Sequence, residues 1–194
     1  MILAFTGAGI SCASGIPTFA EQPGIRDNLT RYCATHRPED YMKTIRNMQL
    51  ICDAAEPNDA HLALAEYRIP VITMNVDGLH QKAGSSYVLP IHGTLPDIVL
   101  YGDHAPLYQT AHDLVFRLRS GDFFLIIGTS YYTNIASQLK FSALGQGADV
   151  IEINDDAEHR VRSFLSLAET DKETFDEFLL REYNDGIIKP PYSL

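Results

Sequence analysis

The sequence predicts an α/β fold built on one doubly wound parallel sheet, and two patterns lead to this fold class. Short apolar runs recur along the chain, each bounded by turn residues, at Ile2–Phe5, Val71–Met74, Val88–Ile91, Ile98–Tyr101, Phe123–Ile127 and Val150–Ile153. Runs that are apolar at nearly every position are typical of parallel strands buried on both faces. Stretches able to form helices separate these runs, and this alternation indicates parallel strands joined by crossover helices.

Helical spacing of apolar residues marks two of the connections, Asp59–Tyr67 and His112–Leu118. Beyond Ala168, the tail is expected to hold one amphipathic helix, with Phe175 and Phe178 on one face. Right-handed crossovers bring the carboxyl ends of parallel strands to one edge of the sheet, so a ligand is expected along that edge.

The segment between residues 21 and 52 departs from this alternation. It is polar, carries Pro23, Gly24 and Pro38, and contains no strand run before residue 48. We interpret it as a loop followed by a short helical insertion around Asp40–Cys52. Residues 1–194 are therefore expected to form a single domain with a small insertion at about residues 21–52.

Composition limits the classes of function. The 194 residues are 45% hydrophobic, which is enough to bury one sizeable core. The formal net charge of −10 repels phosphate backbones, so nucleic acid is a poor candidate partner. The same charge mildly favours basic peptides, and it also has a simpler explanation as a surface that keeps the protein in solution.

Neither a membrane span nor export is expected from the sequence. No apolar run approaches the roughly 18 residues of a transmembrane helix, and the short run after Met1 is cut off by Thr6-Gly7, unlike a signal peptide. The three cysteines are Cys12, Cys33 and Cys52, and no C-x-x-C pair occurs. That pattern argues against a disulfide framework and a zinc ribbon, so a cytoplasmic protein without a metal site is expected.

A glycine-rich stretch follows the first predicted strand. Gly7 and Gly9 lie where a strand would turn into a helix, a geometry that can present backbone N–H groups to a pyrophosphate. Glycine at such a turn serves equally often as a simple tight turn. The third glycine of the Rossmann dinucleotide fingerprint would fall at Cys12 and is missing.

Six ordered patterns extend this stretch into a resemblance. They are G-A-G-I-S-x-x-S-G-I-P-x-F at residues 7–19, P-N-x-x-H-x-A-L at 57–64, T-M-N-V-D-G-L-H-x-x-A-G at 73–84, I-H-G-T at 91–94, P-D-I-V-L-Y-G-D at 96–103, and G-T-S at 128–130 followed by I-N at 153–154. In this order they are similar to the motifs of the sirtuins, NAD-dependent protein deacylases with a Rossmann-like domain. The resemblance covers most of the chain.

The resemblance implies a reaction and its catalytic residues. In sirtuins the bond between nicotinamide and ribose breaks while an acyl-lysine oxygen attacks the sugar. The position of His92 acts as general base on a ribose hydroxyl, a role that suits the near-neutral pKa of imidazole. Asn75 and Asp77 take the family positions that hold the nicotinamide amide and a structured water. As bare residues, Asn and Asp at a strand end also serve as helix N-caps.

The resemblance also implies which residues bind. The NAD-contacting positions are Gly7, Ala8, Gly9, Ile10, Ser11, Phe19, Met74, Asn75, Asp77, Gly128, Thr129, Ser130 and Asn154. An acyl-lysine peptide would add as a strand against Ile98, Val99, Leu100, Tyr101 and Gly102. Without the resemblance, the residues after Phe123–Ile127 fit ordinary turn chemistry, and the second set fits an ordinary sheet edge.

The chain departs from the family pattern at three places that bear on chemistry. The zinc module, two C-x-x-C pairs in most sirtuins, is missing, because Thr94 and Leu95 join I-H-G directly to P-D-I-V. Ala20 stands where the family has an arginine near the cofactor phosphates, and Arg26 is a nearby candidate substitute. Met74 stands where a glutamine contacts ribose hydroxyls, a contact that a thioether makes poorly.

Three functions are therefore compatible with the sequence. The first is an NAD-dependent protein-lysine deacylase. The second is an NAD glycohydrolase or ADP-ribosyltransferase, and the third is a non-catalytic module that binds NAD or ADP-ribose. The presence of His92, Asn75 and Asp77 favours the two enzymes over the module, whereas the replacements at Ala20 and Met74 favour the second and third functions.

Overall fold

The structure is a computed structural model, and it describes residues 1–18, 23–131, 133–154 and 156–170. Its centre is a five-stranded sheet in the order β3-β2-β1-β6-β7, with every pair of neighbouring strands parallel. The strands are β1 (Ile2–Thr6), β2 (Val71–Thr73), β3 (Val88–Pro90), β6 (Phe123–Ile127) and β7 (Asp149–Ile153). The predicted doubly wound parallel sheet is confirmed.

Strand β1 lies at the centre because it is apolar on both faces. Ala4 pairs with Val71 of β2 on one side and with Leu125 of β6 on the other. The chain winds outward from β1 to β3, crosses back, and winds outward again from β6 to β7. The direction of winding therefore reverses between β1 and β6, and in such sheets ligands bind at the carboxyl ends of the strands beside this reversal.

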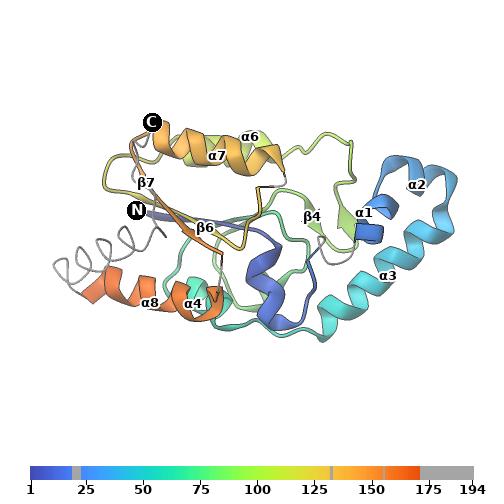
Figure 1. Ribbon diagram of the computed structural model, residues 1–194, viewed down its shortest axis with the longest axis horizontal. Coiled ribbons are helices and arrows are strands. Elements are labelled where there is room, and N and C mark those ends of the chain that lie inside the picture. The colour runs from blue at the N-terminus through green and yellow to red at the C-terminus, as the bar shows by residue number, and fades with distance from the viewer. Residues whose placement is uncertain (19–22, 132, 155, 171–194) are drawn as a thin grey trace.

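Helices cover both faces of the sheet (Figure 1). One face carries α4 (Asp59–Glu66) and α8 (Ala157–Thr170), which pack against each other, and the other carries α6 (Tyr108–Val115) and α7 (Asn134–Gly145). Each face has its own apolar core. Side chains alternate along β1, so that Ala4 belongs to the core under α4 and α8, whereas Leu3 and Phe5 belong to the core under α6 and α7.

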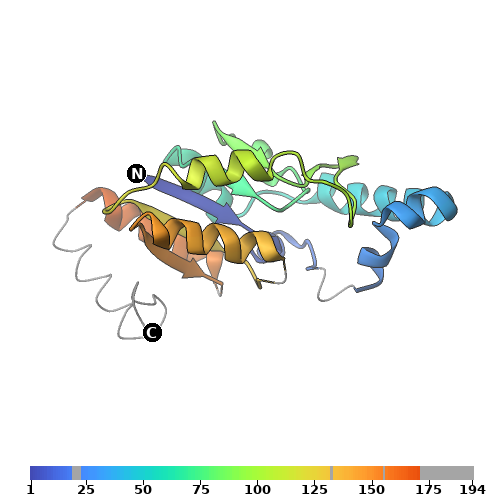
Figure 2. The same cartoon turned by 90° about the horizontal axis from the view of Figure 1, so that it is seen from above.

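The insertion lies beyond one end of the sheet and contains three helices, α1 (Pro23–Asn28), α2 (Arg31–His36) and α3 (Pro38–Ala54) (Figures 1 and 2). The predicted helix around Asp40–Cys52 is confirmed. The expectation of a loop before it is wrong from Pro23 onward, because short helices form there. Thr30 accepts a hydrogen bond from the Cys33 amide as the N-cap of α2, and Leu29 and Ile45 give the insertion a small apolar centre.

One predicted strand is not part of the central sheet. Instead of a strand over Ile98–Tyr101, the chain forms a two-stranded antiparallel ladder of β4 (Gly93–Thr94) and β5 (Asp97–Ile98), and Tyr101 makes an isolated bridge to Thr30. The run is apolar for a different reason. Ile98 and Tyr101 pack against the apolar centre of the insertion rather than between two layers of helices.

The ends of other elements also differ from the prediction. The predicted helix His112–Leu118 is α6, which begins at Tyr108 and ends at Val115, although Leu118 is still buried in the same core. The short α5 (Leu79–Lys82) follows β2, and α8 was not predicted. The predicted helix in the tail lies outside the described residues. None of the helices in the described ranges is long and apolar enough to cross a membrane.

Candidate active site

The loops after β1 and β6 meet at the point where the sheet reverses its winding. Gly9 donates its amide hydrogen to the Gly128 carbonyl at 2.9 Å, and Gly7 donates to the carbonyl of Ile127. A Cβ at Gly9 would lie 2.7 Å from the Gly128 Cα, so no other residue fits there without a shift of backbone. Gly128 has a φ of 61°, the left-handed region that favours glycine. The predicted glycine positions are thus needed to bring the two loops together.

The stretch after Gly7 is a 3₁₀ helix, η1 (Ala8–Ser14), rather than the start of a regular α-helix. The amides of Gly7 and Gly9 are bonded to strand β6 and the residue that follows it, so they are committed within the protein. These two amides therefore hold the loop against β6 rather than face the open end of the sheet. The glycines instead shape the edge, and side chains from η1 and β2 form its polar surface.

Three polar side chains converge beside this loop. The Asn75 amide nitrogen donates to the Ser11 hydroxyl and to the Gly7 carbonyl, both at 3.1 Å. Ser11 in turn donates to Asp77 Oδ2 at 2.7 Å, while Asp77 Oδ1 accepts from the Leu79 amide at 2.9 Å. Asp77 therefore accepts from the first amide of α5 and is also a member of the polar cluster. Predicted residues from two separate motifs thus form one hydrogen-bonded group.

A pocket opens next to this polar cluster. Ser11, Asn75 and Asp77 line one part of it, and most of the rest is apolar, from Ala8, Ile16, Pro17, Ile25, Val76, Met48, Ile51 and Cys52. The last three residues lie on α3, so the insertion supplies one wall. Sequence reasoning assigned no site role to α3. Its amphipathic pattern was visible, but nothing in it showed which element its apolar face would meet.

His92 follows β3, directly after the buried Ile91. Its Nδ1 lies 3.3 Å from the Met74 carbonyl oxygen, and its Nε2 lies 2.7 Å from the hydroxyl of Tyr108, the first residue of α6. Burial lowers the pKa of His92, against a smaller upward effect of the Met74 carbonyl. The imidazole is therefore neutral near pH 7. Tyr108 belongs to none of the sequence motifs and was missed.

The segment predicted to bind the substrate peptide runs beside this histidine. The Val99 amide donates to the His92 carbonyl at 2.9 Å, and the Tyr101 amide donates to the carbonyl of Leu29 in the insertion. Leu100 is buried and Gly102 is exposed. The guanidinium of Arg26 lies over the Tyr101 ring at 5.2 Å. Arg26 is thus placed near the predicted peptide segment.

Other predicted cofactor residues follow β6 and β7, namely Gly128, Thr129, Ser130 and Asn154. The Thr129 amide donates to Asn154 Oδ1 at 2.9 Å, which ties the end of β7 to the loop after β6. Met74 lies across from them, where its sulfur accepts from the Thr133 hydroxyl at 3.1 Å. Ser130 is exposed, and Ile10 is buried in the core. Phe19 lies outside the described residues.

The side chain of Asn58 holds the glycine loop through residues of η1, a role that the sequence did not indicate. Its side-chain nitrogen donates to the Ile10 carbonyl at 2.7 Å and to the Ser14 hydroxyl at 3.1 Å. Its oxygen caps α4 and accepts a hydrogen bond from Nδ1 of His61 at 3.0 Å. The rings of His61 and His80 lie 4.8 Å apart between centroids with a tilt of 57°, and both rings are buried. Asn58 and His61 of the P-N-x-x-H pattern thus support the glycine loop from α4.

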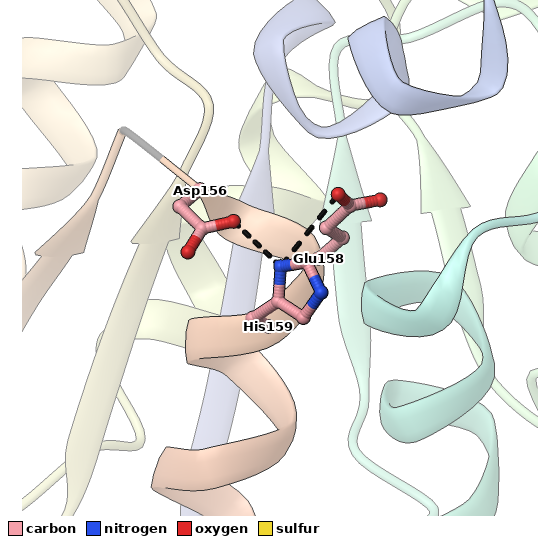
Figure 3. A group of neighbouring side chains, drawn as sticks. All are labelled: Asp156, Glu158 and His159. Atoms are coloured by element: carbon pink, nitrogen blue, oxygen red, sulfur yellow. Dashed lines mark hydrogen bonds and ion pairs between the residues drawn. The ribbon is translucent and has the colours of Figure 1, made fainter.

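A second cluster of polar side chains lies at the start of α8, away from this network. Asp156, Glu158 and His159 lie close together, and Figure 3 shows both carboxylates directed at the His159 ring. Asp156 and His159 are exposed, and the nearby Asp156 carboxylate raises the pKa of His159. Exposed acidic groups of this kind occur commonly without a metal, so the cluster is explained as a surface ion pair.

The chain is similar in sequence to a known family and to several of its members. Residues 7–96 match the family model described as the Sir2 family. The chain is 30% identical over 199 residues to NAD-dependent protein deacylase 1 of Caldanaerobacter subterraneus subsp. tengcongensis, an alignment covering 79% of this chain and 82% of the relative. It is 34% identical over 201 residues to an NAD-dependent protein deacylase of Aeropyrum pernix, covering 78% and 80%.

Solved structures agree on the fold. A crystal structure of a Sir2 homologue in complex with NAD superposes with a TM-score of 0.78 at 24% identity, covering 85% of this chain and 88% of that one. A mutant Sir2 homologue in complex with ADP-ribose superposes with a TM-score of 0.76 at 22% identity, covering 92% and 93%. At these identities the superpositions establish the fold alone.

Proposed function

The chain belongs to the Sir2 family, and from that premise we propose that it is an NAD-dependent protein-lysine deacylase, which transfers the acyl group to ADP-ribose with release of nicotinamide. One observation carries the proposal. His92, Asn75 and Asp77 follow neighbouring strands at the same end of the sheet as the glycine loop. Asn75 and Asp77, together with Ser11, also line a pocket that is otherwise apolar.

The residues of the pocket fit the nicotinamide end of NAD. An aromatic ring that bears an amide needs apolar walls and a few fixed polar groups, and Asn75 and Asp77 supply an amide and a carboxylate within such walls. Gly7, Gly9 and Gly128 leave no side chains where the loops meet. When bound, NAD supplies the ribose carbon that the acyl oxygen attacks and the hydroxyl that receives the acyl group.

The protein's own part in this reaction is to position groups and to move one proton. Ser11, Asn75 and Asp77 hold one another, so their polar atoms are fixed before a ligand arrives. His92 is neutral, and its Nε2 has the lone pair that can take a proton from a hydroxyl. The pocket wall on α3, formed by Met48, Ile51 and Cys52, is apolar and would shield the ring end of a bound cofactor from water.

We propose that an acyl-lysine peptide lies along Ile98–Gly102. Support comes from the bond between the Val99 amide and the His92 carbonyl, which fixes this segment next to the base. Backbone pairing along such a segment would bind peptides with little sequence preference. The nearby Arg26 and Tyr101 are the side chains most able to add preference.

We also propose that the protein uses no structural zinc, is cytoplasmic, and forms one domain with a small insertion at about residues 21–52. Support for the first comes from the direct link between β4 and β5 through the Thr94-Leu95-Pro96 segment. All three cysteines lie in the described ranges and are thiols rather than disulfides, which suits a reducing compartment. The apolar centre of the insertion includes Val76 and Leu95 from the main body. Metal analysis of purified protein tests the zinc proposal, and one zinc per chain would refute it.

Product analysis tests the function. The protein is incubated with NAD, with and without an acetyl-lysine peptide. O-acyl-ADP-ribose with peptide is expected, and the absence of this product would refute the proposal. ADP-ribose without peptide would indicate the glycohydrolase alternative, which one observation favours. The side chain of Met74 packs against Thr133 and offers no hydrogen-bond donor to a sugar. Binding without turnover would indicate a module that only binds NAD or ADP-ribose.

A further inference from the structure

Both ring nitrogens of His92 have partners, and the partners determine where its proton lies. A carbonyl oxygen can only accept, so the 3.3 Å contact with Met74 places the imidazole hydrogen on Nδ1. Nε2 then carries the lone pair and accepts the hydrogen of the Tyr108 hydroxyl at 2.7 Å. The basic nitrogen of the candidate base is therefore directed at a phenol.

The environment keeps this pair neutral. Burial lowers the pKa of His92, and burial also raises the pKa of Tyr108, with a smaller contribution from Tyr101. The two rings lie 5.7 Å apart between centroids and are tilted by 45°, so the contact is a hydrogen bond between ring edges rather than a stack. The resting arrangement is therefore a phenol donating to a neutral imidazole.

A substrate hydroxyl can reach Nε2 only by displacing the Tyr108 hydroxyl or by acting through it. A hydroxyl has one hydrogen to donate and two lone pairs, so Tyr108 can donate to Nε2 and still accept a hydrogen bond from another hydroxyl. After transfer, the same oxygen can accept from Nε2–H. A phenol therefore suits both protonation states of the base, whereas a carboxylate or an ammonium group suits only one.

We propose that Tyr108 is a proton relay for His92: the substrate hydroxyl gives its proton to the Tyr108 oxygen while Tyr108 gives its own proton to His92 Nε2. The substrate O–H bond and the original phenol O–H bond break, and a new phenol O–H bond and an Nε2–H bond form. The substrate oxygen keeps the electron pair of its O–H bond and uses it to form the bond to the acyl carbon. Tyr108 stays neutral, and the positive charge comes to rest on an imidazolium that the Met74 carbonyl holds. The relay rests on the proposed function, since it supplies the base of that reaction.

Tyr108→Phe tests the relay because it removes one oxygen and keeps the ring. The matched control is Tyr67→Phe, which removes a phenol oxygen that bonds Ser166 on the far face of the sheet. Single-turnover acyl transfer from an acetyl-lysine peptide is measured with NAD. We expect Tyr108→Phe to be slower by about 10- to 100-fold, the effect of one lost hydrogen bond to a charged group. Tyr67→Phe should match the wild type.

Two further readouts separate a relay from a structural role. The rate in mixtures of light and heavy water should curve for the wild type, where two protons move together, and should be linear for Tyr108→Phe. Nitrogen NMR of His92 needs neither NAD nor activity. It should show the Nδ1–H tautomer in the wild type, which leaves the lone pair on Nε2 directed at the Tyr108 hydroxyl.

The experiments distinguish a failure of the proposed function from a failure of the relay alone. If the wild type forms no O-acyl-ADP-ribose, the proposed function fails, and the relay, which depends on it, is overturned with it. If the wild type is active and Tyr108→Phe transfers acyl groups equally fast or faster, Tyr108 only covers the base and the relay alone is wrong. An Nε2–H tautomer in the wild type would also overturn the relay, because Nε2 could then accept no proton from Tyr108.

Discussion

The chain buries imidazoles in two regions, and the surroundings give them opposite properties. His61 and His80 lie behind the glycine loop, 0% and 1% exposed, with ring centroids 4.8 Å apart. Burial lowers the pKa of His61 to about 4 and that of His80 to about 3. His92 lies at the open edge of the sheet, is only partly buried, and also has its pKa lowered by burial.

The difference lies in the hydrogen-bond partners. Within the described part of the chain, His61 Nε2 and His80 Nδ1 have none, and each ring is the other's near neighbour. A proton taken up there would gain no acceptor and would repel a second charge. Both ring nitrogens of His92 instead have partners, the Met74 carbonyl and the Tyr108 hydroxyl. A buried histidine with an unpartnered nitrogen therefore resists protonation, whereas His92 has an acceptor ready for the proton on each side of its ring.

The largest expected effect is on His92. His92→Ala should slow acyl transfer by about 10²–10⁴-fold, the usual contribution of a general base. NAD affinity should change little, because a base acts on a proton in the transition state and adds little to ground-state binding. Steady-state turnover and calorimetric NAD binding check this, with the exposed His36→Ala as control. Equal turnover by His92→Ala would mean that the base lies elsewhere.

The buried pair should make stability depend on pH. Below about pH 6.5 the unfolded chain binds protons at His61 and His80 that the folded chain does not bind. The free energy of unfolding should therefore decrease as the pH is lowered. It should level off below the folded pKa values of about 4 and 3. From pH 7 to 5 the two together should lower it by about 2–4 kcal/mol. Urea unfolding at both pH values measures this.

His80→Gln is the control for that slope. Glutamine keeps a polar group near the Thr6 hydroxyl, which His80 Nε2 contacts at 3.0 Å, but it does not titrate. The loss of stability per pH unit should be smaller in this variant by about 1.4 kcal/mol, the value of one proton. An unchanged slope would show that His80 is protonated in the folded state and that the two regions do not differ as argued.

A smaller effect is expected at Asn58, which joins the buried pair to the glycine loop. Asn58→Ala removes the cap of α4 and the bonds to Ile10 and Ser14. A lost cap costs about 1 kcal/mol, and the unsatisfied Ile10 carbonyl adds to it, so a loss of about 1–2 kcal/mol is expected. Thermal or urea unfolding measures this, and Asn58→Asp, which keeps the cap, should lose less.

The fold was largely predictable because its signal is local. The five strands of the sheet were found from their apolar runs, to within one residue at each end, since burial on both faces leaves a continuous mark in the sequence. Ile98–Tyr101 was misassigned as a sheet strand because an apolar run does not tell which layer covers it. Helix α8 was missed although Val161, Phe164 and Leu165 lie at helical spacing and are buried.

The site was predictable only where it coincides with motifs. His92, Asn75 and Asp77 were named, and the structure brings Asn75 and Asp77 together through Ser11. The sequence did not predict Tyr108 or the pocket wall on α3. Each belongs to a helix that reaches the site through tertiary packing, and the sequence of such a helix shows only that it has an apolar face. No spacing along the chain encodes the contact between residues 92 and 108, which requires the path of the connection before α6.

The last prediction concerns the acid side of the pH–rate profile and separates the two regions in one experiment. His92 must be neutral to accept a proton, so kcat/KM should fall as pH drops through its pKa. Because burial holds that pKa below the ordinary 6.5, the midpoint of this fall should lie below pH 6.5. Acid unfolding driven by His61 and His80 could imitate the fall, so His80→Gln is measured alongside. A fall caused by His92 should keep its midpoint in that variant and should be reversed at once on return to pH 7. A midpoint above 6.5, or one that moves with His80→Gln, would show that the rate does not follow the titration of His92.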